Sequence, residues 1–225
     1  MHTLNGKLDE AEAVFKEAIS ENPDDVLGYT TLVSYYLGQK KFEEAKKILA
    51  AGQEKLPDNV SLSLLKANLF ERDRNFDAAL AEYEELYKKS PNSEVVINNL
   101  ASMLTEYRTD EASIKRAYEL AKRFRNSNIP HFKDTLGWIQ YRMGNAGEAT
   151  SLLKAVVKQA PNVAVFRYHL GMSFLADKQD SSATRELERA LELSKNQPLV
   201  QEEEVRKILQ ELRASAGSAS TETQN

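Results

Sequence analysis

The sequence predicts an all-α fold built from repeated antiparallel helix pairs, and three observations lead to this prediction. Pro23, Pro57 and Pro91 stand at regular intervals, and Pro161 falls close to the same lattice two periods further on, which indicates a repeat of roughly 34 residues. Between the prolines, apolar residues recur at the three- and four-residue spacings of amphipathic helices. Alternation of apolar and polar residues, the pattern of a half-buried strand, is essentially absent.

The prolines are expected to mark the turns between successive helix pairs. A short polar residue follows each of them, at Asp24, Asp58, Asn92 and Asn162. Short polar side chains cap helix N-termini because their oxygen atoms accept hydrogen bonds from the free N–H groups of the first turn. We therefore expect one helix to end at each proline and the next to begin at a capping residue directly after it.

Composition narrows the class of protein. The chain has 225 residues, of which 41% are hydrophobic and 28% charged, as is ordinary for a folded protein with a sizeable core. A net charge of −4 does not favour binding to nucleic acid or to an anionic membrane surface. The absence of cysteine excludes disulfides, thiolate catalysis and cysteine-bound metals, but suits either redox environment. No apolar run approaches the roughly 18 residues of a membrane span, so direct membrane insertion is not predicted.

With these features, the units resemble tetratricopeptide repeats (TPRs), which are helix-turn-helix modules with small residues at positions 8 and 20. We place the starts of five units at Val26, Val60, Glu94, Pro130 and Ala164. Position 8 then holds Val33, Ala67, Ala101, Gly137 and Gly171, and position 20 holds Ala45, Ala79, Ala149 and Ala183. The resemblance implies a right-handed superhelical TPR solenoid of antiparallel helix pairs, in which these residues let helices approach closely.

The third unit departs from the pattern. It is two residues longer than the others, and its segment RTDEASIKRAYELAKRF fits the repeat only if the second helix gains about one turn. Ala117 then stands at position 20 and Phe124 at position 27.

The two ends of the chain are expected to differ from the repeats. The predicted divisions are a half repeat, consisting of a second helix only, at 1–23, five TPR units at 24–197, a capping helix at 198–213 and a disordered polar tail at 214–225. The capping helix carries Val205, Ile208, Leu209 and Leu212 on one face, which suits closure of the last apolar surface.

The half repeat has no partner helix before it in the sequence. Its apolar residues Leu8, Val14, Phe15 and Ile19 are therefore expected to be partly exposed. Either further repeats of a longer protein, of which this chain would be a fragment, or self-association through this helix would cover them.

No set of residues predicts catalysis or a cofactor. His131, Asp134 and His169 are conceivable metal ligands, but packed or solvated histidines are the preferred interpretation. The segment GNAG at 144–147 lacks the Lys and Ser/Thr of a phosphate-binding loop. Acidic pairs lie where exposed helix faces are expected, without an enclosing pocket. The chain is therefore predicted not to be an enzyme.

The predicted binding surface is the concave groove of the solenoid. The first helix of every unit lines such a groove, which accepts an extended peptide or a partner helix. The resemblance implies that positions 2, 5, 9, 12 and 13 face it. The site residues predicted on this basis are Asn68, Arg72, Asn98, Asp134, Trp138, Tyr141, Arg142, Tyr168 and Met172.

Trp138 has two interpretations at this point. At position 9 it would face the groove and form an aromatic patch with Tyr141, Tyr168 and Met172, beside Arg142. Alternatively, it packs between the first helices of adjacent units, because buried aromatic residues are commoner than binding ones.

The predicted function is that of a non-enzymatic scaffold that binds a protein or peptide. A clamp for chaperone C-termini is disfavoured, because position 5 holds Thr30, Leu64, Asn98, Asp134 and Tyr168 rather than the required lysine. RNA binding by related helical repeats would need a basic groove, which is missing.

The alternative function is an accessory role in exopolysaccharide export or assembly, with glycan contacting the aromatic groove. The segments INNLASML and DTLGWIQYRMG within residues 94–195 resemble bacterial TPR proteins of exopolysaccharide and PEP-CTERM cell-envelope systems. This resemblance implies a bacterial cell envelope or periplasmic location, with the cytoplasm also open.

Overall fold

A computed structural model describes the backbone of residues 2–222 and the side chains of residues 10–215. Over this part of the chain it contains 12 α-helices and one 3-10 helix, and no strand. The predicted all-α TPR solenoid class is confirmed. The helices form two compact units, Met1–Leu100 and Ala101–Asn225, which we call unit one and unit two and describe separately.

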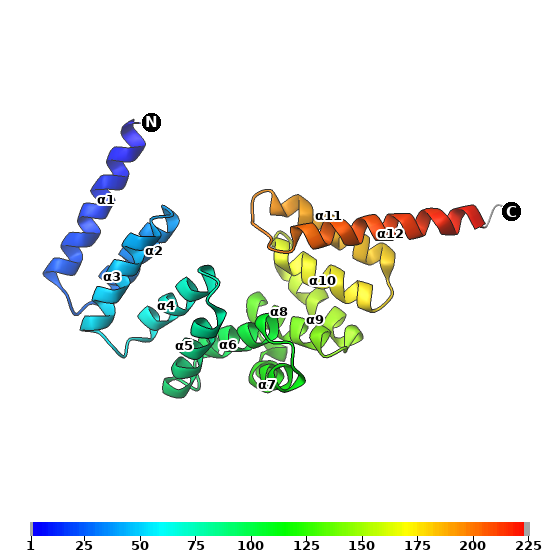
Figure 1. The fold of residues 1–225 in the computed structure, drawn as a ribbon, viewed down its shortest axis with the longest axis horizontal. Coiled ribbons are helices and arrows are strands. Elements are labelled where there is room, and N and C mark those ends of the chain that lie inside the picture. The colour runs from blue at the N-terminus through cyan, green and yellow to red at the C-terminus, as the bar shows by residue number, and fades with distance from the viewer. Residues whose placement is uncertain (1, 223–225) are drawn as a thin grey trace. The chain divides into compact units, whose positions relative to one another are not determined.

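Unit one consists of a leading helix and stacked helix pairs (Figure 1). Helices α2, α4 and α6 begin at Val26, Val60 and Glu94, where the sequence placed the starts of repeat units. Each is the first helix of its repeat. The helices are α1 (His2–Glu21), α2 (Val26–Gly38), α3 (Phe42–Lys55), α4 (Val60–Arg72), α5 (Phe76–Lys89) and the first half of α6 (Glu94–Tyr107).

Unit two continues the same arrangement from the second half of α6. Its helices are α7 (Glu111–Ala121), the 3-10 helix η1 (Lys122–Asn126), α8 (Pro130–Arg142), α9 (Ala146–Gln159), α10 (Ala164–Ala176), α11 (Asp180–Ser194) and α12 (Glu202–Glu222). The last helix, α12, packs on α11, and its C-terminal part projects beyond that helix (Figure 1).

Small residues bring the two helices of each pair together, as predicted. Every alanine assigned to position 8 or position 20 is fully buried. The two glycines at position 8 fit closely against a leucine at position 24 of the second helix. A Cβ atom on Gly137 would lie 2.8 Å from the side chain of Leu153, and one on Gly171 would lie 2.7 Å from Leu187. Neither position accommodates a larger side chain unless the helices move apart.

The turn within a pair repeats the same backbone conformation. Position 15 has a positive φ in four units: 58° at Lys40, 59° at Arg74, 80° at Gly144 and 56° at Lys178. Only the fourth unit uses glycine, for which this conformation is free of steric strain. Gly144 therefore lies in the turn between two helices.

The irregular third repeat has the predicted register. Its second helix, α7, is continued by η1, which adds a tighter turn before α8. Ala117 is fully buried and Phe124 is 1% exposed, and the Phe124 ring lies 4.7 Å from that of Phe132. The extra residues are therefore accommodated by lengthening the second helix.

The predicted capping residues were wrong by one position. The side chain of Asp25, not Asp24, accepts a hydrogen bond from the backbone of α2, and Asn59, not Asp58, caps α4. The residue directly after proline belongs to the turn, so the capping geometry is reached only at the second residue beyond the proline. Asp58 instead forms an ion pair with Lys89 at 2.6 Å.

The expectation of a disordered tail from residue 214 also differs from the structure. Helix α12 continues to Glu222. Alanine is the best helix former and no proline interrupts this segment, so the helix continues through it although Gly217 disfavours it. Residues 223–225 lie outside the described part of the chain.

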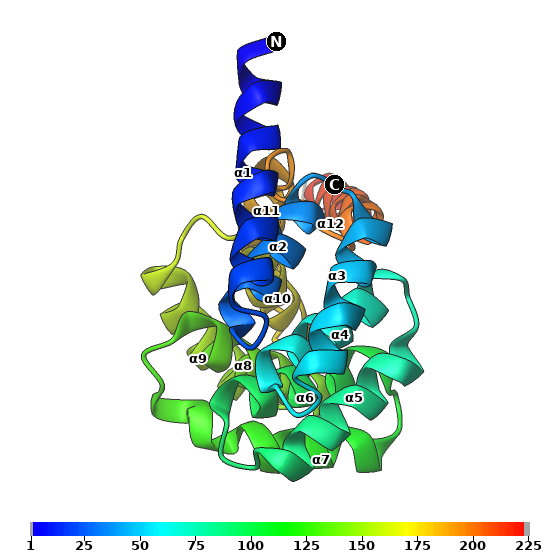
Figure 2. The same ribbon diagram turned by 90° about the vertical axis from the view of Figure 1, so that its left-hand side faces the viewer.

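The leading helix α1 packs against α2 along its C-terminal half, and its N-terminal half projects past α2 (Figure 2). Phe15 and Ile19 are half-buried against the core of the first pair, whereas Val14 is 59% exposed. The side chain of Leu8 lies outside the described residues. None of the described helices has the length and apolar character needed to cross a membrane.

Candidate functional site

The first-helix face of unit one is open to solvent. We define this face by positions 2, 5, 9 and 12 of α2, α4 and the start of α6. Two apolar side chains at position 2 are exposed, Leu27 at 65% and Val95 at 48%. Asn68, at position 9 of α4, is also exposed. Exposed apolar side chains beside polar ones are the usual composition of a binding surface.

A polar network lies on this face and centres on the hydroxyl of Tyr83. That residue belongs to α5, is 1% exposed, and directs its hydroxyl group back toward the first helices. The hydroxyl lies 2.6 Å from Oε1 of Glu71 and 2.8 Å from Oδ1 of Asn68, both on α4. Asn99 of α6 lies near this hydroxyl and lowers its pKa. The hydrogen bonds of the network therefore join α4 and α5, with α6 beside them.

The carboxyl group of Glu71 is unusual in this network. It is half-buried, and burial raises its pKa above the ordinary value of 4.5, although the hydrogen bond from Tyr83 acts in the opposite direction. Burial raises a carboxyl pKa because it disfavours the charged form. The pKa of Tyr83 is also raised, by burial and by the charge of Glu71.

The remaining predicted residues of this face have different surroundings. Asn98 is partly buried, and its Oδ1 atom is inaccessible and has no hydrogen-bond partner. Its amide nitrogen donates to Oδ1 of Asn99 at 3.4 Å. Arg72 lies outside the network, because its guanidinium stacks on the Phe42 ring and pairs with Asp73 at 3.4 Å.

Positions 5 and 9 of α8 and α10, in unit two, are closed. Trp138 is 7% exposed, Tyr168 3% and Met172 7%. These residues form one hydrophobic cluster with side chains that α11, α12 and the segment before α12 contribute. The cluster members from those elements are Leu187, Ala190, Leu199, Val205 and Leu209. The predicted aromatic residues are thus brought together, but as part of a core rather than as an exposed patch.

Ring stacking explains the burial of Trp138. Its ring lies parallel to those of Tyr141, at 4.5 Å, and His169, at 4.2 Å. His169 belongs to α10, so Trp138 packs between the first helices of adjacent units, which is the second of its two interpretations. The large side chain fills the space between these helices and leaves no ring face free for a ligand.

The candidate metal ligands do not meet at one point. His169 Nδ1 lies 2.9 Å from Oδ2 of Asp134, and both residues are buried. His131 packs instead against the edge of the Phe166 ring, at 4.9 Å. Over the described residues, no group of three His, Asp or Glu side chains is placed to hold a metal ion.

Arg142 fastens the end of α6. Its guanidinium donates to the carbonyl oxygen of Thr105 at 2.5 Å and to that of Arg108 at 3.4 Å. These carbonyl groups lie at the end of a helix, where they lack partners within it. Arg142 also borders a surface cleft of about 590 Å³ in unit two, together with Thr109, Glu111, Ile114, Lys115, Tyr118, Glu119 and Met143. The arginine therefore stabilises the irregular repeat.

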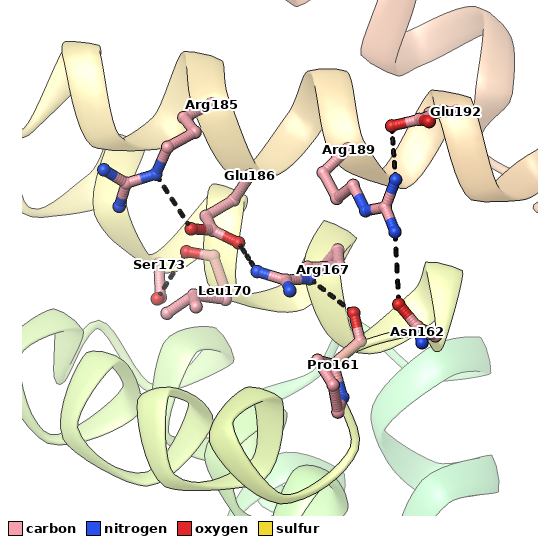
Figure 3. A network of polar contacts seen from close by, with 9 residues as sticks. All are labelled: Pro161, Asn162, Arg167, Leu170, Ser173, Arg185, Glu186, Arg189 and Glu192. Atoms are coloured by element: carbon pink, nitrogen blue, oxygen red, sulfur yellow. Dashed lines mark hydrogen bonds and ion pairs between the residues drawn. The ribbon is translucent and has the colours of Figure 1, made fainter.

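Unit two contains a buried carboxylate, that of Glu186, whose negative charge is compensated by arginine side chains. Glu186 on α11 is 5% exposed and accepts hydrogen bonds from two arginines, Arg167 at 2.5 Å and Arg185 at 3.2 Å (Figure 3). Arg167 also donates to the carbonyl oxygen of Pro161 at 2.9 Å, which ties α11 to the turn before α10. Over the described residues, Glu71 forms no ion pair of this kind.

The residues predicted from the sequence did not include Tyr83 or Glu71. A signal was present at position 24, which holds Leu49, Leu153 and Leu187 in three other units but Tyr83 in the second. A buried tyrosine hydroxyl needs a hydrogen-bond partner. Polar residues one helix away, Asn68 and Glu71, are the hydrogen-bond partners that the structure gives it.

Comparison with known proteins identifies the repeats. Family models of the tetratricopeptide repeat match residues 3–69 and 135–198. The chain is 25% identical over 171 residues to TPR repeat-containing protein PA4667 of Pseudomonas aeruginosa; this alignment covers 74% of the chain and 28% of that protein. The chain therefore spans less than a third of that relative's length.

Solved structures share the fold at low sequence identity. The hetero-tetramer Cut9–Hcn1 of the APC/C matches with a TM-score of 0.76 and 15% identity, covering 94% of this chain and 41% of that one. YrrB, described as a TPR protein with an unusual peptide-binding site, matches with a TM-score of 0.56 and 19% identity, covering 81% and 93%. Tetratricopeptide repeats generally mediate protein–protein interaction, and their scaffolds are generally non-enzymatic.

Proposed function

Because this chain is built of tetratricopeptide repeats, we propose that it is a non-enzymatic scaffold that binds an extended peptide segment of a partner protein. The proposed binding surface is the first-helix face of unit one. The observation that carries this proposal is the exposure of Leu27 on α2 and Val95 on α6, on the same face as the polar network of α4 at Tyr83.

The two kinds of side chain have complementary roles in such a surface. Exposed apolar groups gain free energy when a partner covers them. The amide and carboxyl groups of Asn68 and Glu71 satisfy the backbone or polar side chains of an extended segment, which fixes its register. Since Tyr83 already orders these groups in the free protein, little conformational entropy is lost when a ligand binds.

Selection from a phage-displayed library of random linear peptides, with the full chain as bait, tests the proposal. We expect selected peptides to protect amides of α2, α4 and the start of α6 from hydrogen exchange. The double variant Leu27→Asp with Val95→Asp should lose these peptides. Val14→Asp is the matched control, because it places the same charge at an equally exposed apolar residue on α1. Retained binding in the double variant, or protection confined to α3 and α5, would refute this location.

Glycan binding has weaker support than peptide binding. Sugars stack on exposed aromatic faces, whereas Trp138 and Tyr168 are buried. The exopolysaccharide role stays a prediction from the sequence. The same holds for the cell-envelope resemblance and for self-association through α1. A rise in melting temperature with selected peptides, but not with oligosaccharides, separates the two functions.

A further inference from the structure

We infer that the first-helix face of unit one selects segments carrying a lysine or arginine side chain, whose cationic group binds the carboxylate of Glu71; this inference rests on the proposed function. Glu71 lies at position 12 of α4, within the network of Tyr83, Asn68 and Asn99.

Some acceptor atoms of this face have no donor. A tyrosine hydroxyl has one hydrogen, yet the Tyr83 hydroxyl lies within hydrogen-bond distance of oxygen atoms on both Glu71 and Asn68. The buried Oδ1 atom of Asn98 has no partner. A ligand that brings several N–H donors therefore fits this face better than one that brings acceptors. Ammonium and guanidinium groups bring such donors and no acceptor.

A cationic donor is favoured because Glu71 is a half-buried carboxylate without a counter-ion. The protein resolves the same problem differently at Glu186, where Arg167 and Arg185 both donate to the carboxylate (Figure 3). No lysine or arginine of the described chain forms an ion pair with Glu71. A basic side chain of the partner supplies the missing charge, and charge-assisted hydrogen bonds are stronger than neutral ones.

Folding has already removed much of the water around Glu71. Burying a carboxylate is ordinarily the main cost of a buried ion pair. Here most of that cost falls on folding rather than on binding, because Glu71 is half-buried in the free protein. The hydrogen bond from Tyr83 also fixes the orientation of the carboxylate. A ligand cation therefore meets a group that is both oriented and partly desolvated.

The basic group is expected within an extended segment rather than at its terminus. Helix α4 packs beside α2, and Asn99 of α6 lies near Tyr83, which bonds to α4. Exposed apolar residues occur on both neighbours, Leu27 on α2 and Val95 on α6. Positions 2 and 12 of a first helix lie about 15 Å apart along its axis. A segment that reaches Glu71 and also covers these apolar side chains therefore extends well beyond its lysine or arginine.

The test uses peptides selected on the full chain from the random library described above. We expect them to be enriched in a basic residue flanked by apolar ones. By fluorescence anisotropy with a fluorescein-labelled peptide, Glu71→Gln should weaken binding about tenfold or more. Glu85→Gln is the matched control, because it removes the same charge from an exposed position on α5. In the peptide, replacing the basic residue with glutamine should cause a similar loss, and the two losses should not add.

Three other results would contradict the inference, the choice of a side chain or the proposed function. Selected peptides without a basic residue, or equal binding to the wild type and Glu71→Gln, would overturn the inference but leave the proposed function standing. A requirement for a free N-terminal amine, shown by loss of binding on acetylation, would overturn the choice of a side chain. Failure to select any peptide that protects α2, α4 or α6 would overturn the proposed function as well.

Discussion

The first-helix faces of the two units differ in burial at the same repeat positions. At positions 5 and 9, α2 has Thr30 and Ser34, both accessible to solvent. At the same positions α8 has Asp134 and Trp138, which are buried. At these two positions the face of unit one is polar and open, whereas that of unit two is closed.

Two physical causes produce this difference. Large rings fill the space between adjacent first helices, as Trp138 does between Tyr141 and His169. In addition, α12 and the segment before it cover the end of unit two with Leu199, Val205 and Leu209. A repeat position is therefore only a place on the scaffold. Residue size and neighbouring helices determine whether it binds a ligand or stabilises the core.

The largest expected effect is the loss of the Trp138 ring. Trp138→Ala should lower the free energy of unfolding by about 3–5 kcal/mol, because it leaves a cavity in a buried cluster. The equivalent change in unit one, Asn68→Ala, should cost about 1 kcal/mol or less, since Asn68 is exposed and Tyr83 keeps its bond to Glu71. Urea unfolding monitored by circular dichroism measures both. Similar small losses for the two variants would mean that Trp138 is not a core residue.

The next effect concerns the close approach of helices in unit two. Gly137→Leu should destabilise the protein by about 1–3 kcal/mol or more, because even its Cβ atom would lie 2.8 Å from Leu153. Gly147→Ala on α9 is the control, since no heavy atom lies within 4 Å of the added Cβ. That control should gain up to about 1 kcal/mol, from the higher helix propensity of alanine. An unchanged urea midpoint for Gly137→Leu would contradict the observed packing.

The sequence was sufficient to predict what depends on the repeat. Proline spacing and small residues gave the helix starts and the contact of Gly137 with the second helix, because both follow from local pattern. The state of Trp138 was not predictable, since burial depends on α12 and on the ring of His169, which are distant in sequence. The role of Glu71 also required the structure, because its environment is set by Tyr83 on another helix.

A smaller effect is the pH dependence of stability that Glu71 gives to the first-helix face of unit one. Because the pKa of Glu71 is raised in the folded state, folding favours its protonated form, and this contribution is lost as pH rises from about 4.5 through the folded value. At neutral pH, Glu71→Gln should therefore stabilise the protein by about 1 kcal/mol. Tyr83, Asn68 and Asn99, which surround Glu71, are all neutral there.

Glu85→Gln serves as the control for that pH dependence, with the opposite sign. The hydrogen bond with Lys88 lowers the pKa of Glu85, so its charged form favours folding above about pH 4.5. Its replacement should slightly destabilise the protein at neutral pH. Chemical denaturation at several pH values compares the two variants. Destabilisation by Glu71→Gln at neutral pH would show that the carboxylate is compensated within the protein.

The smallest effect compares how the terminal helices are held. On α1, Glu12 accepts hydrogen bonds from Lys16, Tyr36 and Lys41, and these lower its pKa to about 2. Its contribution to stability is therefore present above about pH 4.5 and is lost as pH falls toward about 2. At neutral pH, Glu12→Gln should weaken the packing of α1 on α2 by about 0.2–1 kcal/mol, which is the range of exposed ion pairs.

The matched change at the other end is Glu188→Gln, which removes the ion pair between Glu188 and Arg213 of α12 at 2.7 Å. Because Val205 and Leu209 are buried, α12 should stay in place when this pair is lost. Hydrogen exchange of the α1 and α12 amides measures both outcomes. We expect the amides of α1 to exchange faster in Glu12→Gln, because a polar contact holds the first helix. We expect the exchange of the α12 amides to be unchanged in Glu188→Gln, because an apolar cluster holds the last helix. If amide exchange became faster by the same factor in both helices, surface charge rather than burial would hold α12 in place. The packing of α12 on unit two would then depend on pH and salt, as the packing of α1 does.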